Sequence, residues 1–203
     1  MILSAYSRGM ASLETKIIFG AMAAVGLGYA QLKDMVPEGV EIACHNSFES
    51  TTISGPAENI SKFVEVLKAK GIFAKEVSSS NFPYHSSYIR NLGPNLLARL
   101  KTVHKTPRKR SQRWISSSYP QSKWHLEECQ YTSAEYQTNN VLSSVLFEEA
   151  LSHIPQNALM IEIAPHGLLQ AILKRAMTET INLSLAQRGH SHNDQFILSA
   201  LGR

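Results

Sequence analysis

His85 is the side chain in this sequence that is best suited to acid–base chemistry. It follows an irregular stretch, residues 78–83, and opens a predicted helix, a position where an imidazole is often exposed in a cleft. A neutral imidazole near pH 7 can take a proton from a serine hydroxyl and later return it. Taken alone, His85 has a simpler interpretation as an ordinary surface residue. The hypothesis that His85 transfers a proton therefore needs other side chains that could form a site with it.

A serine nucleophile of the usual kind has no matching motif in these residues. The sequence contains no G-x-S-x-G, and its nearest match, Gly189-His190-Ser191-His192-Asn193, lacks the second glycine. A nucleophile elbow needs small residues on both sides of the serine because the backbone turns sharply there. His190 and His192 could instead form a weak metal pair, but a solvated linker is the favoured interpretation. We expect no metal site.

Two further side chains could serve a site if they point inward. Arg8 lies in a predicted first helix, within Ala5-Tyr6-Ser7-Arg8-Gly9, where an arginine is usually solvated. Its planar guanidinium is suited to two-point binding of a carboxylate. His166 follows a predicted buried strand, so it could line a cleft or cap the next helix.

Composition describes a globular chain of one domain, or of one domain with a small inserted subdomain. The hydrophobic fraction is 43%, the charged fraction 18% and the net charge +4. Five of the nine residues from 105 to 113 are basic, namely Lys105, Arg108, Lys109, Arg110 and Arg113. Such a run is usually a solvated loop, although it could dock phosphate or an acidic partner. Nucleic-acid binding is disfavoured, because no helix-turn-helix, zinc or stacking motif accompanies the run.

Cysteine usage and apolar segments indicate a cytoplasmic protein. Cys44 and Cys129 cannot build a disulfide framework and show no metal-ligand spacing. The apolar residues 17–30 resemble the core of a signal peptide, but they are fewer than the roughly 20 needed to span a bilayer. Their glycines suit a buried strand followed by a turn. We expect no membrane association.

Residues 20–77 predict a compact β-α-β-β-α-β unit. Strands are expected at 21–25, 40–44, 51–54 and 72–77, with a short helix at 29–35. The second helix starts at Pro56, buries Ile60, Phe63, Val64 and Leu67 on one face, and ends at Gly71. This alternation is typical of a ferredoxin-like fold.

The remaining chain alternates helices with strands, which indicates a parallel sheet covered by helices. Helices are expected at 1–13, 89–103 (kinked at Gly93-Pro94), 141–151 and 168–175. Strands are expected at 114–117, 180–185 and 159–163, the last of them buried. Both ends look cut, so we expect the core of this part to be incomplete.

Several stretches, in this order and spacing, resemble the malonyl/acetyltransferase domain of animal fatty acid synthases. Upstream stretches are Ser4-Ala5-Tyr6-Ser7-Arg8-Gly9, Gly20-Ala21-Met22-Ala23-Ala24-Val25-Gly26-Leu27, Ala43-Cys44-His45-Asn46-Ser47, Thr52-Ile53-Ser54-Gly55-Pro56 and Phe73-Ala74-Lys75-Glu76-Val77. Downstream stretches are Tyr84-His85-Ser86, Ser133-Ala134-Glu135-Tyr136, Val145-Leu146-Phe147-Glu148-Glu149-Ala150-Leu151 and Glu162-Ile163-Ala164-Pro165-His166. The likeness covers nearly the whole chain.

The resemblance implies an α/β fold, with a partial α/β-hydrolase-like three-layer subdomain and an inserted ferredoxin-like subdomain. The large subdomain would comprise residues 1–19 and 79–185, the inserted subdomain residues 20–78, and a linker residues 186–203.

The implied chemistry is a ping-pong acyl transfer. A serine of a G-H-S-x-G motif attacks malonyl- or acetyl-CoA, and the acyl group then passes to the phosphopantetheine thiol of an acyl carrier domain. No cofactor would be permanently bound. The implied partners are that carrier domain, neighbouring synthase domains and CoA thioesters, with no nucleic acid and no membrane.

Four residues match positions with known roles in the family. His85 aligns with the catalytic histidine, and Arg8 with the arginine that pairs with the free carboxylate of malonyl. Asn140 falls where a main-chain carbonyl orients the histidine. Tyr84 sits where the family shapes the acyl pocket, and an aromatic residue there permits small acyl groups.

The departures from the family concern the nucleophile. The G-H-S-x-G segment should lie upstream of Arg8, where the sequence has seven residues. The family's oxyanion donors would be missing with it, so the isolated chain is expected to be inactive. The alternative is a truncated, catalytically dead protein that only binds CoA, a carrier protein or another partner. Ser144 stands where the family usually has proline.

Overall fold

The computed structural model describes residues 2–202 of the chain. They divide into two compact units, Met1–Ala150 (unit 1) and Leu151–Arg203 (unit 2). The subdomain boundaries expected at residues 19, 78 and 185 lie within these units and remain expectations.

The first half of unit 1 is a β-α-β-β-α-β module built on an antiparallel sheet. In chain order its elements are β1 (Gly20–Val25), α2 (Tyr29–Leu32), β2 (Glu41–Ser47), β3 (Ser50–Pro56), α3 (Ala57–Ala69) and β4 (Ala74–Val77). The strand order is β4-β1-β3-β2, and a short strand, β5 (Val145–Leu146), adds to β2 in parallel. This topology is that of a ferredoxin-like fold, as predicted.

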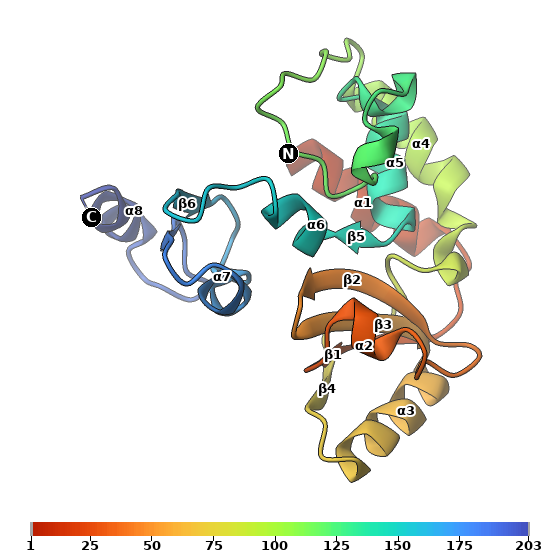
Figure 1. Cartoon of the computed structure of the whole chain (residues 1–203). Helices are drawn as coiled ribbons and strands as arrows, with labels where there is room; N and C mark the ends of the chain where they lie inside the picture. The colour runs from red at the N-terminus through yellow and green to blue at the C-terminus, as the bar shows by residue number, and fades with distance from the viewer. Residues whose placement is uncertain (1, 203) are drawn as a thin grey trace. The chain divides into compact units, whose positions relative to one another are not determined.

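Helix α3 covers one face of this sheet and forms the core of the module (Figure 1). Pro56 directly precedes it, and the residues at the predicted apolar positions are buried. They pack against buried side chains of β1 and β3, among them Ala23, Val25 and Ile53. The backbone of Gly71 then turns with φ +73°, which ends the helix region as predicted.

The apolar stretch at residues 17–30 contains β1, a central strand of the sheet. Strand β1 pairs with β3 on one side and with β4 on the other. The interpretation of this stretch as a buried strand is confirmed. Among residues 2–202, no helix is both long and apolar enough to cross a membrane.

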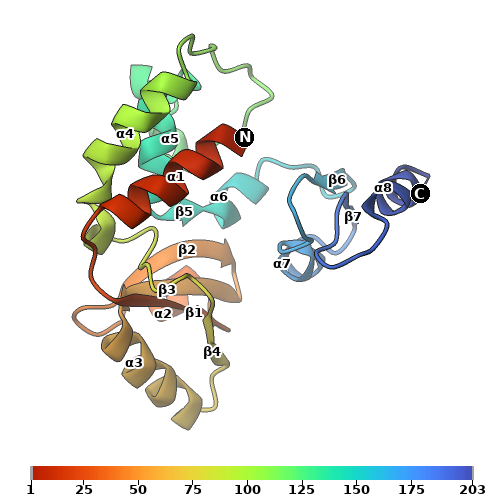
Figure 2. The ribbon, with the colours of Figure 1, turned by 180° about the vertical axis from the view of Figure 1, so that it is seen from behind.

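The second half of unit 1 is helical. Helix α4 (Leu92–Val103) packs against α1 (Ile2–Glu14) and against α5 (Ala134–Leu142), as both ribbon views show (Figures 1 and 2). Short 3₁₀ turns occur at Ser87–Ile89, Gln121–Lys123 and Glu127–Cys129. The buried residues of this cluster are Ala11, Ile89, Leu92, Leu96, Leu100, Ala134 and Val141.

Three sequence predictions in this half are wrong, and the first two concern α4 and residues 114–117. Helix α4 begins at Leu92, so Gly93 and Pro94 lie in its first turn and produce no mid-helix kink. Proline is tolerated there because the first helical N–H groups have no intrahelical acceptor. Residues 114–117 form no strand, since the Ser117 carbonyl accepts one bond, from the Leu146 amide at 2.7 Å, without a ladder around it.

The helix predicted at 141–151 is also wrong, because the segment is broken into three elements. Helix α5 ends at Leu142, β5 follows, and α6 (Phe147–Leu151) begins directly after β5. Ser143 has extended backbone angles, φ −107° and ψ 159°. The chain leaves the helix there so that Val145 and Leu146 can pair with Cys44 and His45 of β2.

Unit 2 is built on two parallel strands, β6 (Leu159–Glu162) and β7 (Ile181–Ser184). Its helices are α7 (Gln170–Ala176) and α8 (Asn193–Leu201), and both contact β7. The strand predicted at 159–163 is confirmed, but its predicted burial is wrong. Leu159, Ile161 and Ile163 are 56%, 47% and 68% exposed, because the helices of unit 2 pack mainly against β7.

Candidate active site

His85 is held by main-chain groups of α5 and of the residues that follow it. Its Nδ1 lies 3.0 Å from the Ser143 carbonyl oxygen, and its backbone amide donates to the Val141 carbonyl at 3.2 Å. The Asn140 backbone acts on the ring as well, because it raises the pKa of His85. The end of α5 therefore fixes both the backbone and the ring of His85.

The contact with Ser143 determines which ring nitrogen carries the proton. A carbonyl oxygen only accepts hydrogen bonds, so Nδ1–H is the donor and the neutral ring has its lone pair on Nε2. Burial lowers the pKa of His85, and the positive charge of Arg8 lowers it further, whereas the bonds to the Ser143 and Asn140 backbones raise it. The net shift is downward, so His85 is mainly neutral at pH 7. This is the form that can accept a proton.

The backbone of His85 is in the left-handed region, with φ +62°. Non-glycine residues seldom adopt this conformation, and they keep it only where the surroundings enforce it. The next residue closes the turn, because the buried Ser86 hydroxyl donates to the Pro83 carbonyl at 2.6 Å. Together with the Val141 bond, this turn imposes the conformation of His85.

The loop before His85 is anchored on the start of β1. The Gly20 amide donates to the Asn81 carbonyl at 2.9 Å, and Pro83 is fully buried against Gly20. A Cβ atom at position 20 would lie 2.5 Å from Pro83 Cδ, so only glycine permits this approach. A glycine in the ferredoxin-like module thus places the loop that leads to His85.

Arg8 and Tyr84 lie beside one another near His85. The Arg8 guanidinium carbon is 5.7 Å from the centroid of the Tyr84 ring, which is within cation–π range. The buried Ser12 hydroxyl donates to the Arg8 carbonyl at 3.0 Å, and its oxygen lies 3.1 Å from the Tyr84 hydroxyl. Because the single hydrogen of Ser12 is used on Arg8, the Tyr84 hydroxyl is the donor in the second bond.

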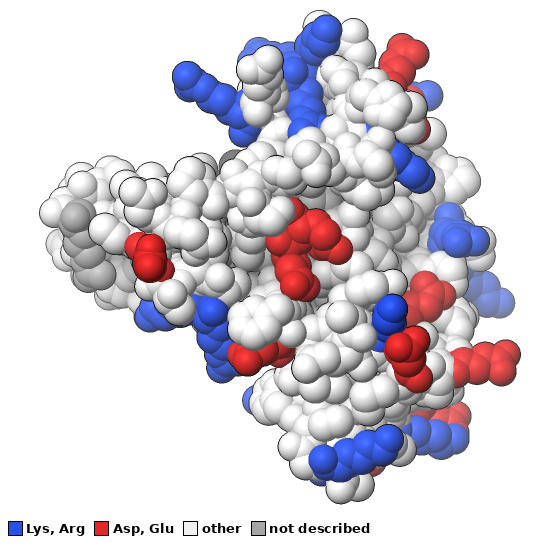
Figure 3. Space-filling view, in the orientation of Figure 1, with Lys and Arg blue, Asp and Glu red and all other residues white. Residues whose placement is uncertain are grey.

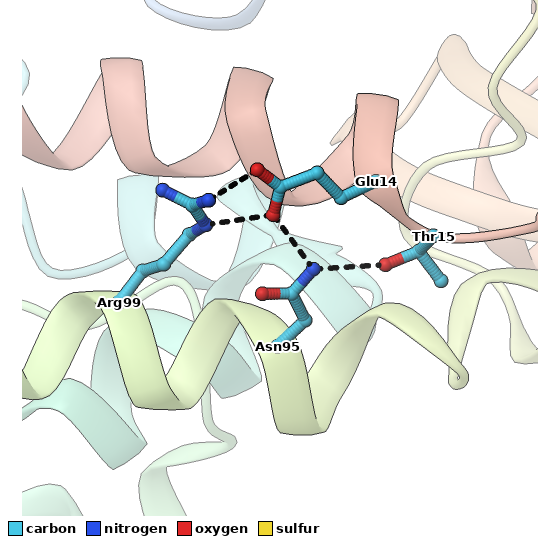
Figure 4. A network of polar contacts seen from close by, with 4 residues as sticks. All are labelled: Glu14, Thr15, Asn95 and Arg99. Carbon is cyan, nitrogen blue, oxygen red and sulfur yellow. Dashed lines mark hydrogen bonds and ion pairs between the residues drawn. The ribbon is translucent and has the colours of Figure 1, made fainter.

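Helix α1, which carries Arg8, is fixed against α4 by a polar network (Figure 4). The Glu14 carboxylate accepts two bonds from Arg99 and one from Asn95, whose amide also donates to Thr15 Oγ1 at 3.4 Å. The bonds from Arg99 and Asn95 hold the pKa of Glu14 below its usual value. This network fixes the position of α1 along α4, and therefore the position of Arg8.

A cavity of about 280 Å³ lies between α1, α4 and α5. Arg8, Asn140 and Val141 line it, together with the pair formed by Ser4 Oγ and His104 Nε2, which are 3.1 Å apart. Neither Tyr84 nor His85 is among its lining residues. The cavity offers a cationic group beside an apolar wall, which suits a small molecule with an anionic end.

The structure brings Arg8, Tyr84 and His85 together, whereas Asn140 takes part through its backbone. The side chain of Asn140 instead donates to Ser118 Oγ at 2.6 Å. The sequence gives no sign of the role of Ser143, because a main-chain carbonyl leaves no signal in the identity of its residue. Ser12 was missed as well, although its spacing of four residues from Arg8 places the two on one face of a helix.

The other histidines considered from the sequence do not join this group. His166 Nδ1 accepts a bond from the Arg188 amide at 3.4 Å, and His190 Nδ1 accepts one from the His192 amide at 3.1 Å. Both contacts lie within unit 2. Within the part of the chain that the structure describes, no group of three or more His, Cys, Asp or Glu side chains is arranged to hold a metal ion.

The basic run at 105–113 forms a loop that is anchored to residues 130–132. The Arg110 amide donates to the Gln130 carbonyl at 2.6 Å, and the Thr132 amide donates to the Arg108 carbonyl at 2.9 Å. The Arg110 guanidinium carbon lies 4.3 Å from the centroid of the Trp124 ring. Lys105, Arg108, Lys109 and Arg113 are exposed. Figure 3 shows Lys and Arg side chains gathered at this end of unit 1.

Comparisons with known proteins agree with this fold. The family model for the acyl transferase domain matches residues 1–200. The chain is 36% identical, over 211 aligned residues, to a highly reducing polyketide synthase from Stachybotrys chlorohalonatus, with 93% of this chain and 8% of that protein covered. The acyltransferase domain from the second module of the salinomycin polyketide synthase superposes with a TM-score of 0.76 at 18% identity, covering 98% of this chain and 46% of that one.

A malonyl CoA-acyl carrier protein transacylase from Coxiella burnetii has a similar fold, with a TM-score of 0.74 at 20% identity. That likeness covers 98% of this chain and 62% of the transacylase. Both solved structures have the mixed α/β architecture that the sequence predicts.

The chain belongs to the acyl transferase domain family. It spans about half the length of the solved salinomycin domain and less than a tenth of the Stachybotrys synthase. The expected membership is therefore confirmed at the level of the acyl transferase domain. The curated relative is a fungal polyketide synthase, so animal fatty acid synthase is a narrower assignment than the family membership itself.

Proposed function

We propose that this chain is part of a malonyl/acetyl acyltransferase of the fatty acid synthase type, in which His85 works with a serine supplied by a segment outside these residues. The observation that carries the proposal is the bond from His85 Nδ1 to the Ser143 carbonyl, which leaves the lone pair of Nε2 to act as a base. The resemblance to animal fatty acid synthases supports the narrower assignment.

The proposed reaction has two half-reactions. In the first, Nε2 of His85 accepts the serine hydroxyl proton as the serine oxygen attacks the thioester carbonyl of malonyl- or acetyl-CoA. The carbon–sulfur bond then breaks, and the proton passes from His85 to the CoA thiolate. In the second, His85 accepts the proton of the phosphopantetheine thiol of a carrier domain as the sulfur attacks the acyl-serine carbonyl. The carbon–oxygen bond to serine then breaks, and His85 returns the proton to the serine oxygen. No permanent cofactor is required.

Arg8 is proposed to select the acyl group. Its guanidinium can form two parallel hydrogen bonds with the free carboxylate of malonyl. The neighbouring Tyr84 ring limits the room beside it, which favours small acyl groups. The pairing of Arg8 with Tyr84 across 5.7 Å supports this arrangement, because it keeps the guanidinium next to the residue that directly precedes His85.

The proposed partners are an acyl carrier domain and the neighbouring domains of a cytoplasmic synthase. A second candidate function is binding without catalysis, in which the chain retains a surface for CoA or a carrier domain. The exposed cations of the basic loop favour this alternative, because clustered Lys and Arg raise the local concentration of anions.

Covalent labelling separates the two functions. Incubated alone with radiolabelled malonyl-CoA, the chain is expected to retain no covalent label. When it is joined to a segment that carries a G-H-S-x-G motif, it is expected to retain one acyl group per molecule, and His85→Gln should abolish the labelling. Labelling of the joined protein that survives His85→Gln would contradict the proposed role of His85.

The Ser4–His104 pair provides the critical control. Its two atoms are 3.1 Å apart, so it is a serine–histidine contact that could be acylated in its own right. If the chain alone becomes labelled and Ser4→Ala removes the label, this pair is the nucleophile and the proposal of an external serine is wrong.

A further inference from the structure

Strand β2 contacts both segments that hold His85. Its first residue, Glu41, accepts a hydrogen bond from the Ser87 amide at 2.8 Å through Oε2, and its Oε1 accepts one from the Ser87 hydroxyl. Ser87 stands two residues after His85 and begins the 3₁₀ turn Ser87–Ile89. Glu41 thus fixes the chain on the C-terminal side of the histidine.

The same strand fixes the segment that holds the ring of His85. The Ser144 hydroxyl donates to the Ile42 carbonyl at 2.9 Å, and β5 pairs with Cys44 and His45. Farther along, His45 Nδ1 lies 2.6 Å from a carboxylate oxygen of Glu149. Ser143, whose carbonyl accepts the bond from Nδ1, directly precedes the first of these contacts. The position of the Ser143 carbonyl therefore depends on how residues 144–149 lie along β2.

His85 requires such support because its backbone has φ +62° and its ring is oriented by the bond from Nδ1 to the Ser143 carbonyl. A residue in the left-handed region relaxes when the surrounding contacts are lost. If Ser87 and Ser143 moved independently, the turn at His85 could open and Nδ1 would lose its acceptor. Anchoring both segments to one strand prevents this movement.

We propose that Glu41 is a positioning residue for His85, holding the turn that follows the histidine while the rest of β2 holds the carbonyl that orients its ring. This inference rests on the proposed function of His85 as the base. It assigns to the ferredoxin-like module a direct part in preparing the site. The group that links the module to the site is the carboxylate of Glu41, the first residue of β2.

The tautomer of His85 tests the proposal without any substrate. Long-range ¹H–¹⁵N correlation spectra of the ¹⁵N-labelled chain report which ring nitrogen carries the proton, and His85→Gln assigns the signals. The neutral wild-type ring is expected to be protonated on Nδ1. In Glu41→Ala the Nδ1–H form should become the minor one, because free imidazole side chains in water prefer the proton on Nε2. In Glu41→Gln, whose amide oxygen can still accept from Ser87, the Nδ1–H form should again dominate.

Glu76→Ala is the matched control, because Glu76 is an exposed carboxylate on β4 of the same sheet. It should leave the His85 signals unchanged. Ser87→Ala removes one of the two bonds to Glu41. It should shift the His85 tautomer in the same direction as Glu41→Ala but by a smaller amount. This variant tests the proposal if Glu41→Ala does not fold. An unchanged His85 tautomer in folded Glu41→Ala and Ser87→Ala chains would overturn the proposal.

Failure of this inference and failure of the proposed function can be distinguished. The spectra are recorded without acyl-CoA and without a carrier domain, so an absence of acyl transfer would leave a tautomer shift in Glu41→Ala intact. Conversely, an unchanged tautomer removes the positioning role of Glu41 and leaves the labelling experiment on His85 unaffected.

Discussion

His85 combines three properties that bear on its candidate role. It has a left-handed backbone, which costs a non-glycine residue on the order of 1–3 kcal/mol. Its ring donates to a main-chain carbonyl, and its pKa is lowered chiefly by burial. An ordinary surface histidine needs none of these features, so the simpler interpretation of His85 from sequence does not account for its surroundings.

The lowered pKa of His85 predicts how stability depends on pH. In the unfolded chain a histidine titrates near 6.5, and in the folded chain His85 titrates lower. Below about pH 6.5 the unfolded state binds the proton first, so the free energy of unfolding should fall as the pH is lowered. Above about pH 6.5 the contribution of His85 to the free energy of unfolding is fully present.

Urea unfolding of the wild type and of His85→Gln at pH 7.5 and pH 5.5 measures this contribution. The other seven histidines are common to both proteins, so their effects largely cancel in the comparison. The wild type should lose more stability between the two pH values than the variant does. An equal loss in both proteins would show that folding does not shift the pKa of His85.

Substitution of Arg8 should separate the two acyl substrates. Removing a charge-assisted, two-point contact costs about 1.5–3 kcal/mol, which corresponds to a reduction of roughly 10- to 150-fold. Arg8→Ala should therefore lower kcat/KM for malonyl transfer by this factor and change acetyl transfer little, because acetyl has no second carboxylate. The measurement requires the chain joined to its serine-bearing segment.

Two further variants control the Arg8 experiment. Arg8→Lys keeps the charge but loses the planar fork, so its malonyl activity should lie between those of the wild type and Arg8→Ala. Arg113→Ala, an exposed arginine of the basic loop, should affect both substrates equally. Equal losses for malonyl and acetyl in Arg8→Ala would remove Arg8 from the proposed role.

Among the elements, α5 has the greatest influence on the site because the backbone at its C-terminal end holds His85. Its N-cap is Ser133, whose side chain accepts a bond from the Tyr136 amide at 3.0 Å. Ser133→Ala should lower the free energy of unfolding by about 1 kcal/mol, the usual cost of losing such a cap. Denaturant unfolding measures the change.

Ser61→Ala is the matched control for the cap, because Ser61 is an exposed serine in the interior of α3. The same substitution there should leave stability unchanged or raise it by about 0.5 kcal/mol, since alanine has the higher helix propensity. A loss at Ser61 as large as that at Ser133 would show that capping is not the cause.

The sequence predicts elements well where local patterns decide them and poorly where distant partners do. The helix after Pro56 follows from the spacing of its four apolar residues, all of which are buried in the structure. The segment 141–151 has an equally helical pattern, yet Val145 and Leu146 pair with Cys44 and His45, about a hundred residues earlier. Periodicity within a window cannot reveal such a partner.

The residues of the candidate site also divide into those that the sequence predicts and those that it does not. His85, Arg8 and Tyr84 are found from side-chain type together with the family resemblance, because imidazole, guanidinium and phenol are themselves the functional groups. Ser143 contributes a carbonyl that any residue could supply, and Glu41 acts through a neighbour of His85. Their roles follow from the fold alone, and residue identity gives no sign of them.

At the scale of the whole molecule, the two units differ in how their sheets are covered. In unit 1, β1 and β3 each have a strand on both sides, and α3 covers the buried face. In unit 2, β6 and β7 have only each other among the described residues, and Leu159, Ile161 and Ile181 are about half exposed or more. Purely parallel sheets normally have both faces covered, so this pair of strands lacks most of the usual sources of stability.

Hydrogen exchange should reveal this difference directly. Local opening of a protein requires little free energy where few apolar contacts are broken, so the amides of β6 and β7 should exchange much faster than those of β1 and β3. We expect a difference of at least about a hundredfold, equivalent to roughly 3 kcal/mol in opening free energy. Exchange followed by NMR in the isolated chain measures both groups in one experiment, with the β1–β3 amides as the internal reference. Protection of β6 and β7 equal to that of β1 and β3 would contradict the prediction, because it would require an apolar cover on the unit 2 sheet that the described residues of unit 2 do not provide.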